Sequence, residues 1–417
     1  MTRNKASTSD RISNLPTEII ENILLRLPLR DTVKACVLSK DWNGKWKTVP
    51  QIVFDESFCT QYPRSYNMRE TLFNCMYQIV HIHKKPITKF ALSIPRLESF
   101  CPVYLLLDRL HKDTLQDFTL WISKGVVLIL FLYTCLQLRH LRLSHCHTTS
   151  PPTTFKGFKR LVTLELHEVN TEINIFESFI SDSPLLEHLT LINCPNTENL
   201  DLDAPNLKYL YFEGPLNSIR FRNTPVLASV TIKATGDFMP KPGEFQPADM
   251  IEVFRCLPVI EDLFVGDNLL MSFAAGNIPD RLPATLEFLK TVVLSKICFG
   301  SLREVSCALC LIRSSPNLQK FKVELNYGAT ADENAAVEFL ETLHFLDISL
   351  KKLREVEMLT FDDSKPVMAF AKLLLVKSPL LEKMYIQLKK NRSTKRFKIL
   401  KEVIRFPRAS SIAEIIC

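Results

Sequence analysis

The sequence predicts an α/β protein in which a small N-terminal unit of three helices is followed by an irregular solenoid of strand and helix repeats. Three observations lead to this prediction. A six-residue apolar frame recurs along most of the 417-residue chain, a proline-containing dipeptide precedes several copies of the frame, and residues 10–50, here called the head, have a separate helical pattern. A single repeat of this kind leaves an apolar edge in water, whereas stacked repeats bury it.

The first helix of the head is predicted between Leu15 and Leu27. Apolar residues recur there at intervals of one, three and four, which is typical of a helix with one buried face. Pro16 stands where the first turn of a helix tolerates proline, and Pro28 prevents the helix from continuing.

Two shorter helices follow in the head. The apolar run from Val33 to Leu38 predicts the second, and Trp42 and Trp46, one helical turn apart, predict the third. About forty residues bury too little apolar surface to be stable alone. We therefore expect the head to share its apolar surface with a neighbouring domain or a partner.

The repeat is the frame L-x-x-L-x-L, with aliphatic or aromatic substitutes, whose alternating apolar positions predict a short strand with one buried face. Its central residues from Phe90 to Met384 are on average about 27 residues apart, within the 20–29 residue range of leucine-rich repeats. Individual steps vary from 20 to 35 residues, with insertions after Ile232 and Val323. The twelve copies begin at Ile87, Leu115, Leu138, Leu161, Leu186, Leu207, Leu227, Ile260, Leu289, Leu318, Leu353 and Leu381.

Two further features support the repeat. Cys146 and Cys194 follow the last frame position by three residues, where leucine-rich repeats place Asn or Cys to bond the backbone of the turn. Segments 172–180 and 248–256, between predicted strands, have helical spacing. We expect a curved solenoid whose strands line one broad face. A proline that pins the turn entering a strand directly follows Ser183, Ala204, Thr224, Leu257, Ser315 and Ser378.

Three motifs of the head, L-P-x-E-I-I-x-x-I-L from Leu15, L-P-x-R-D from Leu27 and L-S-K-x-W-x-x-x-W from Leu38, together resemble an F-box. The resemblance implies that the head docks a Skp-type adaptor of an SCF ubiquitin ligase and, through it, the cullin and RING subunits. The alternative is a helical cap that only seals the next domain. The residues expected to contact the adaptor, some of which must instead pack the helices together, are Leu15, Pro16, Ile19, Ile23, Leu27, Pro28, Val33, Leu38 and Trp42.

Motifs near the C-terminus, within 370–375, 378–384 and 406–410, resemble the FBD domain that closes plant-type F-box proteins with leucine-rich repeats. A cap is physically expected, because the last repeat of a solenoid exposes an apolar face. The resemblance supplies no ligand for this domain. The expected organisation is a tail over 1–9, an F-box over 10–50, a leucine-rich-repeat solenoid over 51–335 and an FBD domain over 336–417.

Composition and motifs argue against an enzyme. The chain has only 10 glycines, and neither G-x-G-x-x-G nor G-x-x-x-x-G-K-[ST] occurs, so close backbone wrapping of a phosphate is not expected. No G-x-S-x-G or H-E-x-x-H sequence is found either. We expect a non-catalytic protein without a cofactor.

Two cysteine clusters have spacings that metal sites also use. Cys307 and Cys310 form a C-x-x-C pair inside an apolar segment, for which buried core thiols are the favoured interpretation over a redox or zinc half-site. His145 and His147 flank Cys146, which already has a place in the repeat, and His140 is nearby. We expect no metal at either cluster.

The formal net charge is +7, and nine of the cations fall within residues 389–408. This stretch could contact phosphates or direct nuclear import, whereas the simpler interpretation is a solvated surface. Only Phe397 and Phe406 could stack on bases there, which argues against nucleic acid as a partner. Residues 1–10 lack the apolar core of a signal peptide, and the longest aliphatic stretch, 126–132, is far too short to cross a bilayer.

The sequence therefore predicts the substrate-recognition subunit of an SCF-type ubiquitin ligase, with the repeat face holding a protein substrate. Twelve cysteines without an export signal indicate a reducing compartment, either cytoplasm or nucleus. The alternatives are an interaction scaffold without ubiquitin transfer and a nucleic-acid-binding protein that uses the basic stretch. The substrate, and any small-molecule co-receptor between it and the repeats, cannot be read from the sequence.

Overall fold

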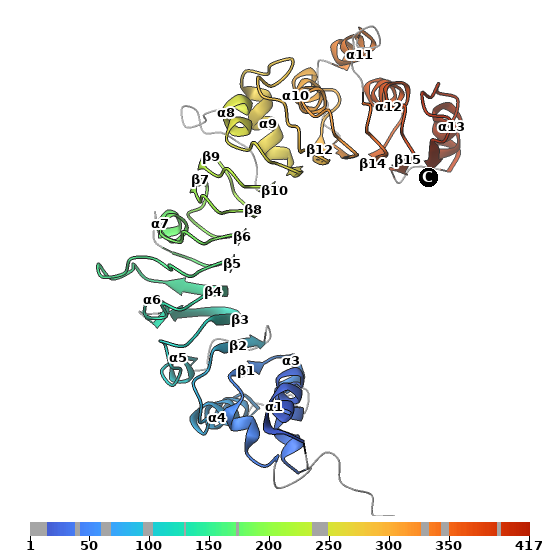
Figure 1. The fold of residues 1–417 in the computed structure, drawn as a ribbon. Coiled ribbons are helices and arrows are strands. Elements are labelled where there is room, and N and C mark those ends of the chain that lie inside the picture. The colour runs from blue at the N-terminus through green and yellow to red at the C-terminus, as the bar shows by residue number, and fades with distance from the viewer. Residues whose placement is uncertain are drawn as a thin grey trace, which may run out of the picture. The chain divides into compact units, whose positions relative to one another are not determined.

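Figure 1 shows the computed structural model of the chain, which describes residues 15–37, 42–59, 68–94, 103–128, 131–171, 175–235, 249–326, 333–342, 350–389 and 393–417. Its residues form two compact units, Met1–Leu186 and Glu187–Cys417. The predicted fold class is confirmed, because a helical head precedes parallel strands that alternate with helices.

The head begins with two short α-helices, α1 (Thr17–Arg26) and α2 (Leu29–Lys34). A 3-10 helix, η1 (Ala35–Val37), continues α2 directly. The third predicted helix is only a 3-10 helix, η2 (Lys45–Thr48), because Gly44 before it adopts the left-handed conformation with φ of 77°. A left-handed residue cannot continue a right-handed helix.

The first unit continues with five parallel strands in the order β1-β2-β3-β4-β5. They are β1 (Gln51–Phe54), β2 (Lys89–Ile94), β3 (Asp117–Leu128), β4 (His140–Thr148) and β5 (Thr163–His167). The helices of this unit are α3 (Glu56–Cys59), α4 (Met68–His81), α5 (Val103–Leu107), α6 (Phe131–Thr134) and α7 (Ile175–Ser181).

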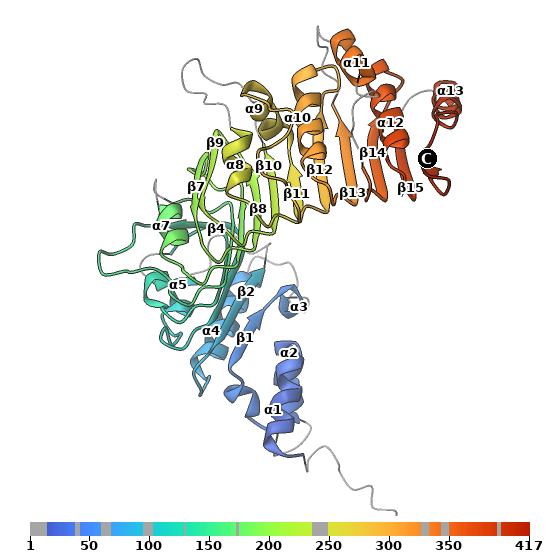
Figure 2. The same cartoon turned by 45° about the horizontal axis from the view of Figure 1, so that its top comes forward.

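The described residues of the second unit form nine parallel strands in the order β6-β8-β10-β11-β12-β13-β14-β15-β16, and Figure 2 shows β10 to β15 side by side. They are β6 (His188–Ile192), β8 (Tyr209–Gly214), β10 (Ser229–Ala234), β11 (Asp262–Val265), β12 (Thr291–Ile297), β13 (Lys320–Leu325), β14 (Glu355–Phe361), β15 (Lys383–Leu388) and β16 (Glu414–Ile416). Two further strands, β7 (Asn199–Asp203) and β9 (Ser218–Asn223), pair separately.

In the part of the second unit that the structure describes, six helices connect the strands, and α10, α12 and α13 lie along the same side of β12 to β15 (Figure 1). The six are α8 (Met250–Arg255), α9 (Asp267–Ala275), α10 (Leu302–Arg313), α11 (Glu333–Thr342), α12 (Lys365–Lys377) and α13 (Ser393–Val403). No helix among the described residues combines the length and the apolar character that a membrane crossing requires.

All twelve strands predicted from the apolar frame are present, and within each unit their central residues stand in register. In the first unit Phe90 is level with Phe118, and Leu141 with Leu164. In the second unit Leu189, Leu210, Val230, Leu263, Val292, Phe321, Val356 and Met384 form one continuous buried row. The stacked frames are therefore the core of each unit.

The proline dipeptides form the predicted turns before the strands. In each case the first residue of the frame donates its N–H to the carbonyl of the residue before proline, as Leu186 does to Ser183 at 3.0 Å and Leu381 to Ser378 at 3.3 Å. Proline has no N–H to lose at this position, so it restricts the turn without removing a hydrogen bond.

A left-handed residue recurs two positions after the last frame residue. It has φ between 48° and 56° and is followed by a residue that is at most 1% exposed. In these repeats the turn thus directs one more side chain into the core, and two of these side chains are the predicted cysteines. The thiol of Cys146 donates to Ser144 O at 3.1 Å, and that of Cys194 donates to Ile192 O at 3.5 Å. The left-handed residues are His145, Glu168, Asn193, Lys296 and Thr360.

The motifs that resemble an FBD domain pack together at the end of the second unit. Ala409 N donates to Leu375 O at 3.0 Å, and Ser410 Oγ donates to Leu381 O at 2.6 Å. The segment after α13 is thereby fixed to the C-terminal end of α12 and to the turn before β15.

Candidate interaction surfaces

The two helices of the head begin in the same way. Pro16 and Pro28 both have φ of −53° and ψ of 145°, an extended backbone that directs the proline carbonyl into the helix that follows. Pro16 O accepts from Ile20 N at 3.1 Å, and Pro28 O accepts from Thr32 N at 2.9 Å. Both proline rings are exposed.

A buried cluster holds the head together and includes part of the predicted adaptor-contact set. Trp42 is only 3% exposed and lies in this cluster, while Leu15 and Ile23 are half-buried against it. The burial of Trp42 assigns it to packing rather than to the accessible surface. Val33 is half-buried, and Leu38 lies outside the described residues. The cluster consists of Ile20, Leu24, Ala35, Trp42 and Val49.

The accessible part of the predicted set comprises Pro16, Ile19, Leu27 and Pro28. Ile19 is 45% exposed and Leu27 is 37% exposed. Val37, which the sequence prediction did not include, is 87% exposed. These five residues, called here the head surface, are apolar and face solvent in the isolated chain. Several exposed apolar side chains on one short segment are a feature of protein interaction sites.

Hydrogen bonds fix the head to the first repeats of its unit. Gln51 Nε2, at the start of β1, donates to Leu25 O at 2.5 Å, and Lys84 N donates to Lys47 O at 2.8 Å. Lys85 Nζ lies 3.1 Å from Glu21 Oε1. The head is thus bonded to the start of β1 and to the segment that precedes β2.

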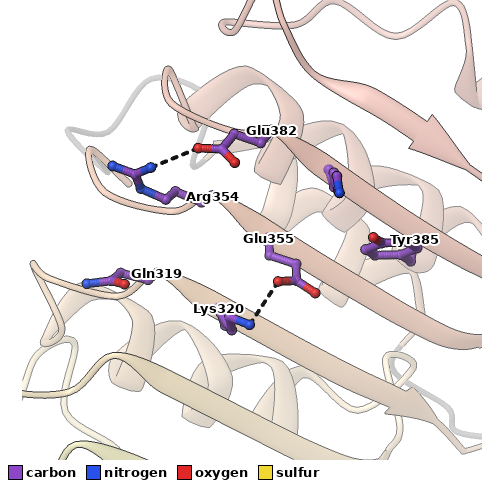
Figure 3. A pocket seen from close by; sticks show the side chains of 7 residues that line it. Gln319, Lys320, Arg354, Glu355, Glu382 and Tyr385 are labelled. Carbon is purple, nitrogen blue, oxygen red and sulfur yellow. Dashed lines mark hydrogen bonds and ion pairs between the residues drawn. The ribbon is translucent and has the colours of Figure 1, made fainter.

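The outward side of the strands, called here the strand face, carries ion pairs between neighbouring strands and the turns before them. Figure 3 shows Lys320 beside Glu355 and Arg354 beside Glu382 in the second unit. Their N–O distances are 3.1 Å and 2.9 Å. Exposed ion pairs contribute little to stability, but each of these cations has a carboxylate partner in the same chain. Similar pairs are Lys89–Asp117 and Arg142–Glu165 in the first unit, and Lys208–Glu187, Lys290–Glu261 and Lys322–Glu357 in the second.

A group of uncharged side chains interrupts these pairs on β8 to β12. Tyr211, Thr231, Phe264 and Val293 stand in one register row, and all four are half-buried. We call this row the strand-face patch. Such a row offers aromatic and aliphatic contact area on a face that is otherwise charged.

Lys233 binds the aromatic end of the strand-face patch. Its Nζ lies 5.0 Å from the ring centre of Tyr211 and 5.6 Å from that of Phe264, within the range of cation–π attraction. The same Nζ donates to Tyr211 Oη at 2.8 Å, and Tyr211 donates to Glu213 Oε2 at 2.5 Å. Burial and the bond to Glu213 raise the pKa of Tyr211, so the phenol stays protonated at neutral pH.

Several hollows lie in the described part of the second unit, and two of them have both partners of an ion pair in their lining. One, of about 210 Å³, lies between the ion pairs of Figure 3 and is lined by Lys320, Glu355, Tyr385 and their neighbours. The other, of about 500 Å³, lies between β9 and α8, where Arg222 pairs with Asp201 and Arg255 with Glu252. The first is lined mainly by polar and charged side chains, whereas the lining of the second also includes Ile219, Phe221 and Val253.

The cysteines that the sequence marked are buried. Cys307 and Cys310 lie on α10, and burial raises the pKa of Cys307 to about 12 and that of Cys310 to about 11. Burial likewise raises the pKa of Cys146 to about 12, while the neighbouring His145 turns to Glu168, with Nε2 3.1 Å from Oε2. Within the described residues no three His, Cys, Asp or Glu side chains group as metal ligands do.

Comparisons with known proteins agree with both parts of the fold. The F-box domain model matches residues 12–52, and the model for the LRR repeats of FBD-associated F-box protein At5g56370 matches residues 105–323. Two similar relatives are F-box/FBD/LRR-repeat protein At1g13570 of Arabidopsis thaliana, 31% identical with 98% of each chain covered, and F-box/LRR-repeat protein 13 of the same plant, 24% identical with 98% of this chain and 96% of the relative covered.

A helical head that matches an F-box, joined to stacked leucine-rich repeats, defines a class of protein-interaction adaptors. Within this class, the chain belongs to the F-box/FBD/LRR-repeat family. The resemblance expected from the sequence is thereby confirmed for the F-box, the repeats and the FBD region.

Proposed function

We propose that the chain is the substrate-recognition subunit of an SCF-type ubiquitin ligase. In this proposal the head surface binds a Skp-type adaptor, and through it the cullin and RING subunits, while the strand face binds a protein substrate. The observation that carries the proposal is an F-box match over a head whose apolar residues Ile19, Leu27 and Val37 are exposed. The free energy of exposed apolar side chains falls when a partner covers them, so their burial favours binding.

This function requires no catalytic side chain in the chain itself. A substrate held on the repeats meets the ubiquitin-conjugating enzyme at a high effective concentration, because the encounter becomes intramolecular. Anchoring of the head through Gln51 and Lys84 supports such a role, since a loosely tethered head would dilute that concentration.

Co-purification with a recombinant Skp-type adaptor tests the head surface. We expect Ile19→Asp and Val37→Asp each to lower adaptor affinity by about tenfold or more, because each places a charge in an apolar contact. Tyr104→Asp is the matched control, since Tyr104 is 64% exposed on α5 and lies outside the head surface. Unchanged adaptor binding by folded Ile19→Asp and Val37→Asp proteins would overturn the adaptor assignment.

Substrate binding is assigned to the strand-face patch on the basis of its aromatic side chains. Tyr and Phe are enriched where protein interfaces have their strongest contacts. We expect Tyr211→Ala with Phe264→Ala to abolish capture of substrates that accumulate under cullin inhibition, with adaptor binding unchanged. If captured proteins were the same with and without this double change, the patch would not be the substrate site.

A scaffold that binds the adaptor without ubiquitin transfer is the alternative function. Reconstitution with adaptor, cullin, RING subunit and conjugating enzymes separates the two. Ubiquitin chains on a captured partner support the ligase function. Capture without any modification, under conditions in which a known substrate receptor is active, favours the scaffold.

A further inference from the structure

Helix α13 of the second unit buries one side and leaves large apolar residues in water on the other. Ile399 is 2% exposed and Val403 is fully buried, so they fix the helix to the protein. Phe397, by contrast, is 71% exposed and Ile404, directly after the helix, is 57% exposed. Together with Lys401, they follow the i, i+4, i+7 spacing that places side chains on one helical face.

The turn after α13 extends this apolar face. The guanidinium of Arg408 donates to Ile404 O at 3.2 Å and to Ala413 O at 2.8 Å, so it holds the two backbone segments next to each other. Ile412, which precedes Ala413, is 64% exposed. The backbone at Ile404 is therefore held near that at Ala413, and Phe397, Ile404 and Ile412 are three exposed large apolar side chains on a short segment.

The same surface carries an unbalanced positive charge. Arg396, Lys398, Lys401 and Arg405 are all exposed, and none forms an ion pair with any acid in the part of the chain that the structure describes. Glu402 is the one acid among residues 396–408. The strand face differs in this respect, because its cations such as Lys320 and Lys322 have carboxylate partners on the next strand. We call these four cations with Phe397, Ile404 and Ile412 the α13 surface.

We infer that the α13 surface binds an acidic protein segment that carries apolar side chains. Unpaired cations attract carboxylates, and the apolar residues distinguish a protein from a nucleic acid, because aliphatic side chains such as Ile404 and Ile412 neither stack on bases nor contact phosphates. Phe397 and Ile404 are seven residues apart, or about 10 Å along a helix axis. Two apolar side chains two helical turns apart in the partner, flanked by Asp or Glu, match this spacing.

This inference is independent of the proposed function, because the α13 surface shares no residue with the head surface or the strand-face patch. A random peptide library displayed on phage, selected on the full chain, tests it. The apolar variant is Phe397→Ser with Ile404→Ser, and the charge variant is Lys398→Glu with Lys401→Glu. Matched controls in the same unit are Phe288→Ser, where Phe288 is 52% exposed, and Lys351→Glu with Lys352→Glu.

The expected result is a set of peptides that lose affinity by about tenfold or more for both test variants and not for the controls, and that are rich in Asp or Glu with Leu, Ile or Phe. Their binding should weaken in added salt. The absence of peptides dependent on α13, or peptides of this kind that lack acidic residues, would overturn the inference. Tighter binding of single-stranded DNA than of any selected peptide, unaffected by the apolar variant, would assign the surface to nucleic acid. If the apolar variant misfolds, the charge variant and its control decide.

Discussion

The hydroxyl of Thr32 in α2 lies 3.2 Å from the carbonyl oxygen of Leu24 in α1. It also lies 3.3 Å from Leu27 O, and Thr32 itself is 4% exposed. The last carbonyls of a helix have no partner within the helix, so this side chain satisfies the end of α1 from the next helix. The contact sets the angle between the two helices that present the head surface.

Replacing Thr32 by Val should therefore destabilise the head while keeping its shape. We expect a loss of about 1 kcal/mol, because the hydrogen bond from the hydroxyl to the carbonyl groups at the end of α1 is lost. Thermal unfolding and hydrogen exchange over residues 17–37 measure the change. Thr17→Val, which alters only an exposed hydroxyl that accepts from Lys45, is the control. Equal protection of α1 in both variants would contradict this role of Thr32.

Neighbouring isoleucines in α1 should separate stability from binding. Ile20 is 1% exposed in the buried cluster, whereas Ile19 is 45% exposed. Ile20→Ala should cost about 2–4 kcal/mol through the cavity it leaves, and Ile19→Ala should change stability by less than about 0.5 kcal/mol. Denaturant unfolding of both variants tests the pair. A similar loss of stability for Ile19→Ala would show that this residue packs inside the chain.

The C-x-x-C thiols should be inert in the folded protein. With pKa values of about 12 and 11, Cys307 and Cys310 are protonated at pH 8, and both are buried. Since the thiolate is the reacting form, iodoacetamide should modify the exposed Cys417 well before either of them. Peptide mass spectrometry over time gives the order. Early modification of Cys310 would indicate an accessible, reactive pair.

Replacement by glycine should change the stability of the protein in opposite directions at two of the left-handed residues. Lys296→Gly removes a Cβ that the left-handed backbone disfavours, which should raise stability by about 0.5–1 kcal/mol after the entropy cost of glycine. Thr360→Gly relieves the same strain, but its hydroxyl accepts from Leu325 N at 3.1 Å and donates to Leu325 O at 2.9 Å. Losing these bonds should leave Thr360→Gly about 1 kcal/mol less stable than wild type. Melting temperatures that move in the same direction would contradict this account.

Neutralising a charge on the strand face should lower the stability of the protein less than reversing it. Glu355 stands level with Lys320 on one side and Lys383 on the other. Glu355→Lys would align three cations, so we expect a loss of about 1 kcal/mol at low ionic strength that added salt reduces. Glu355→Gln should be nearly neutral, because exposed pairs contribute little. Chemical unfolding at two salt concentrations measures both. An equal effect of the two changes would exclude charge repulsion as the cause.

The strands were predictable because alternation at period two and the entry turn both follow from local sequence. Frames such as that of Phe321 combine three apolar positions with a preceding proline turn, and these signals agree. Strands β7 and β9 were not predicted. β7 has only two alternating apolar residues, Leu200 and Leu202, whereas β9 carries a complete frame, Leu216, Ile219 and Phe221, that the sequence prediction left out. Strand β1 was also left out although Val49, Ile52 and Phe54 fit the frame, whereas the frame at β16 has Cys417 in its last position.

The head surface was predictable only in part. Periodicity places Ile19 and Ile20 in the same apolar stripe, and only the packing of Trp42 against Ile20 shows which one is covered. Val37 belongs to an apolar run that predicts burial, yet it stands at the end of η1 with 87% of its surface exposed. Burial depends on residues distant in sequence, so it cannot be assigned from spacing alone.

The shared register of the frames also has a consequence for how the number of repeats changes in evolution. Leu210, Val230 and Leu263 occupy equivalent positions in the stack, although the spacing is 20 residues in the first step and 33 in the second. The number of residues between frames can therefore vary, whereas the position of each frame in the stack is fixed. Recombination between two copies at the same point of any repeat would join halves that already fit. The array can therefore gain or lose whole repeats, and diversify what it recognises, while its hydrophobic core keeps the same packing.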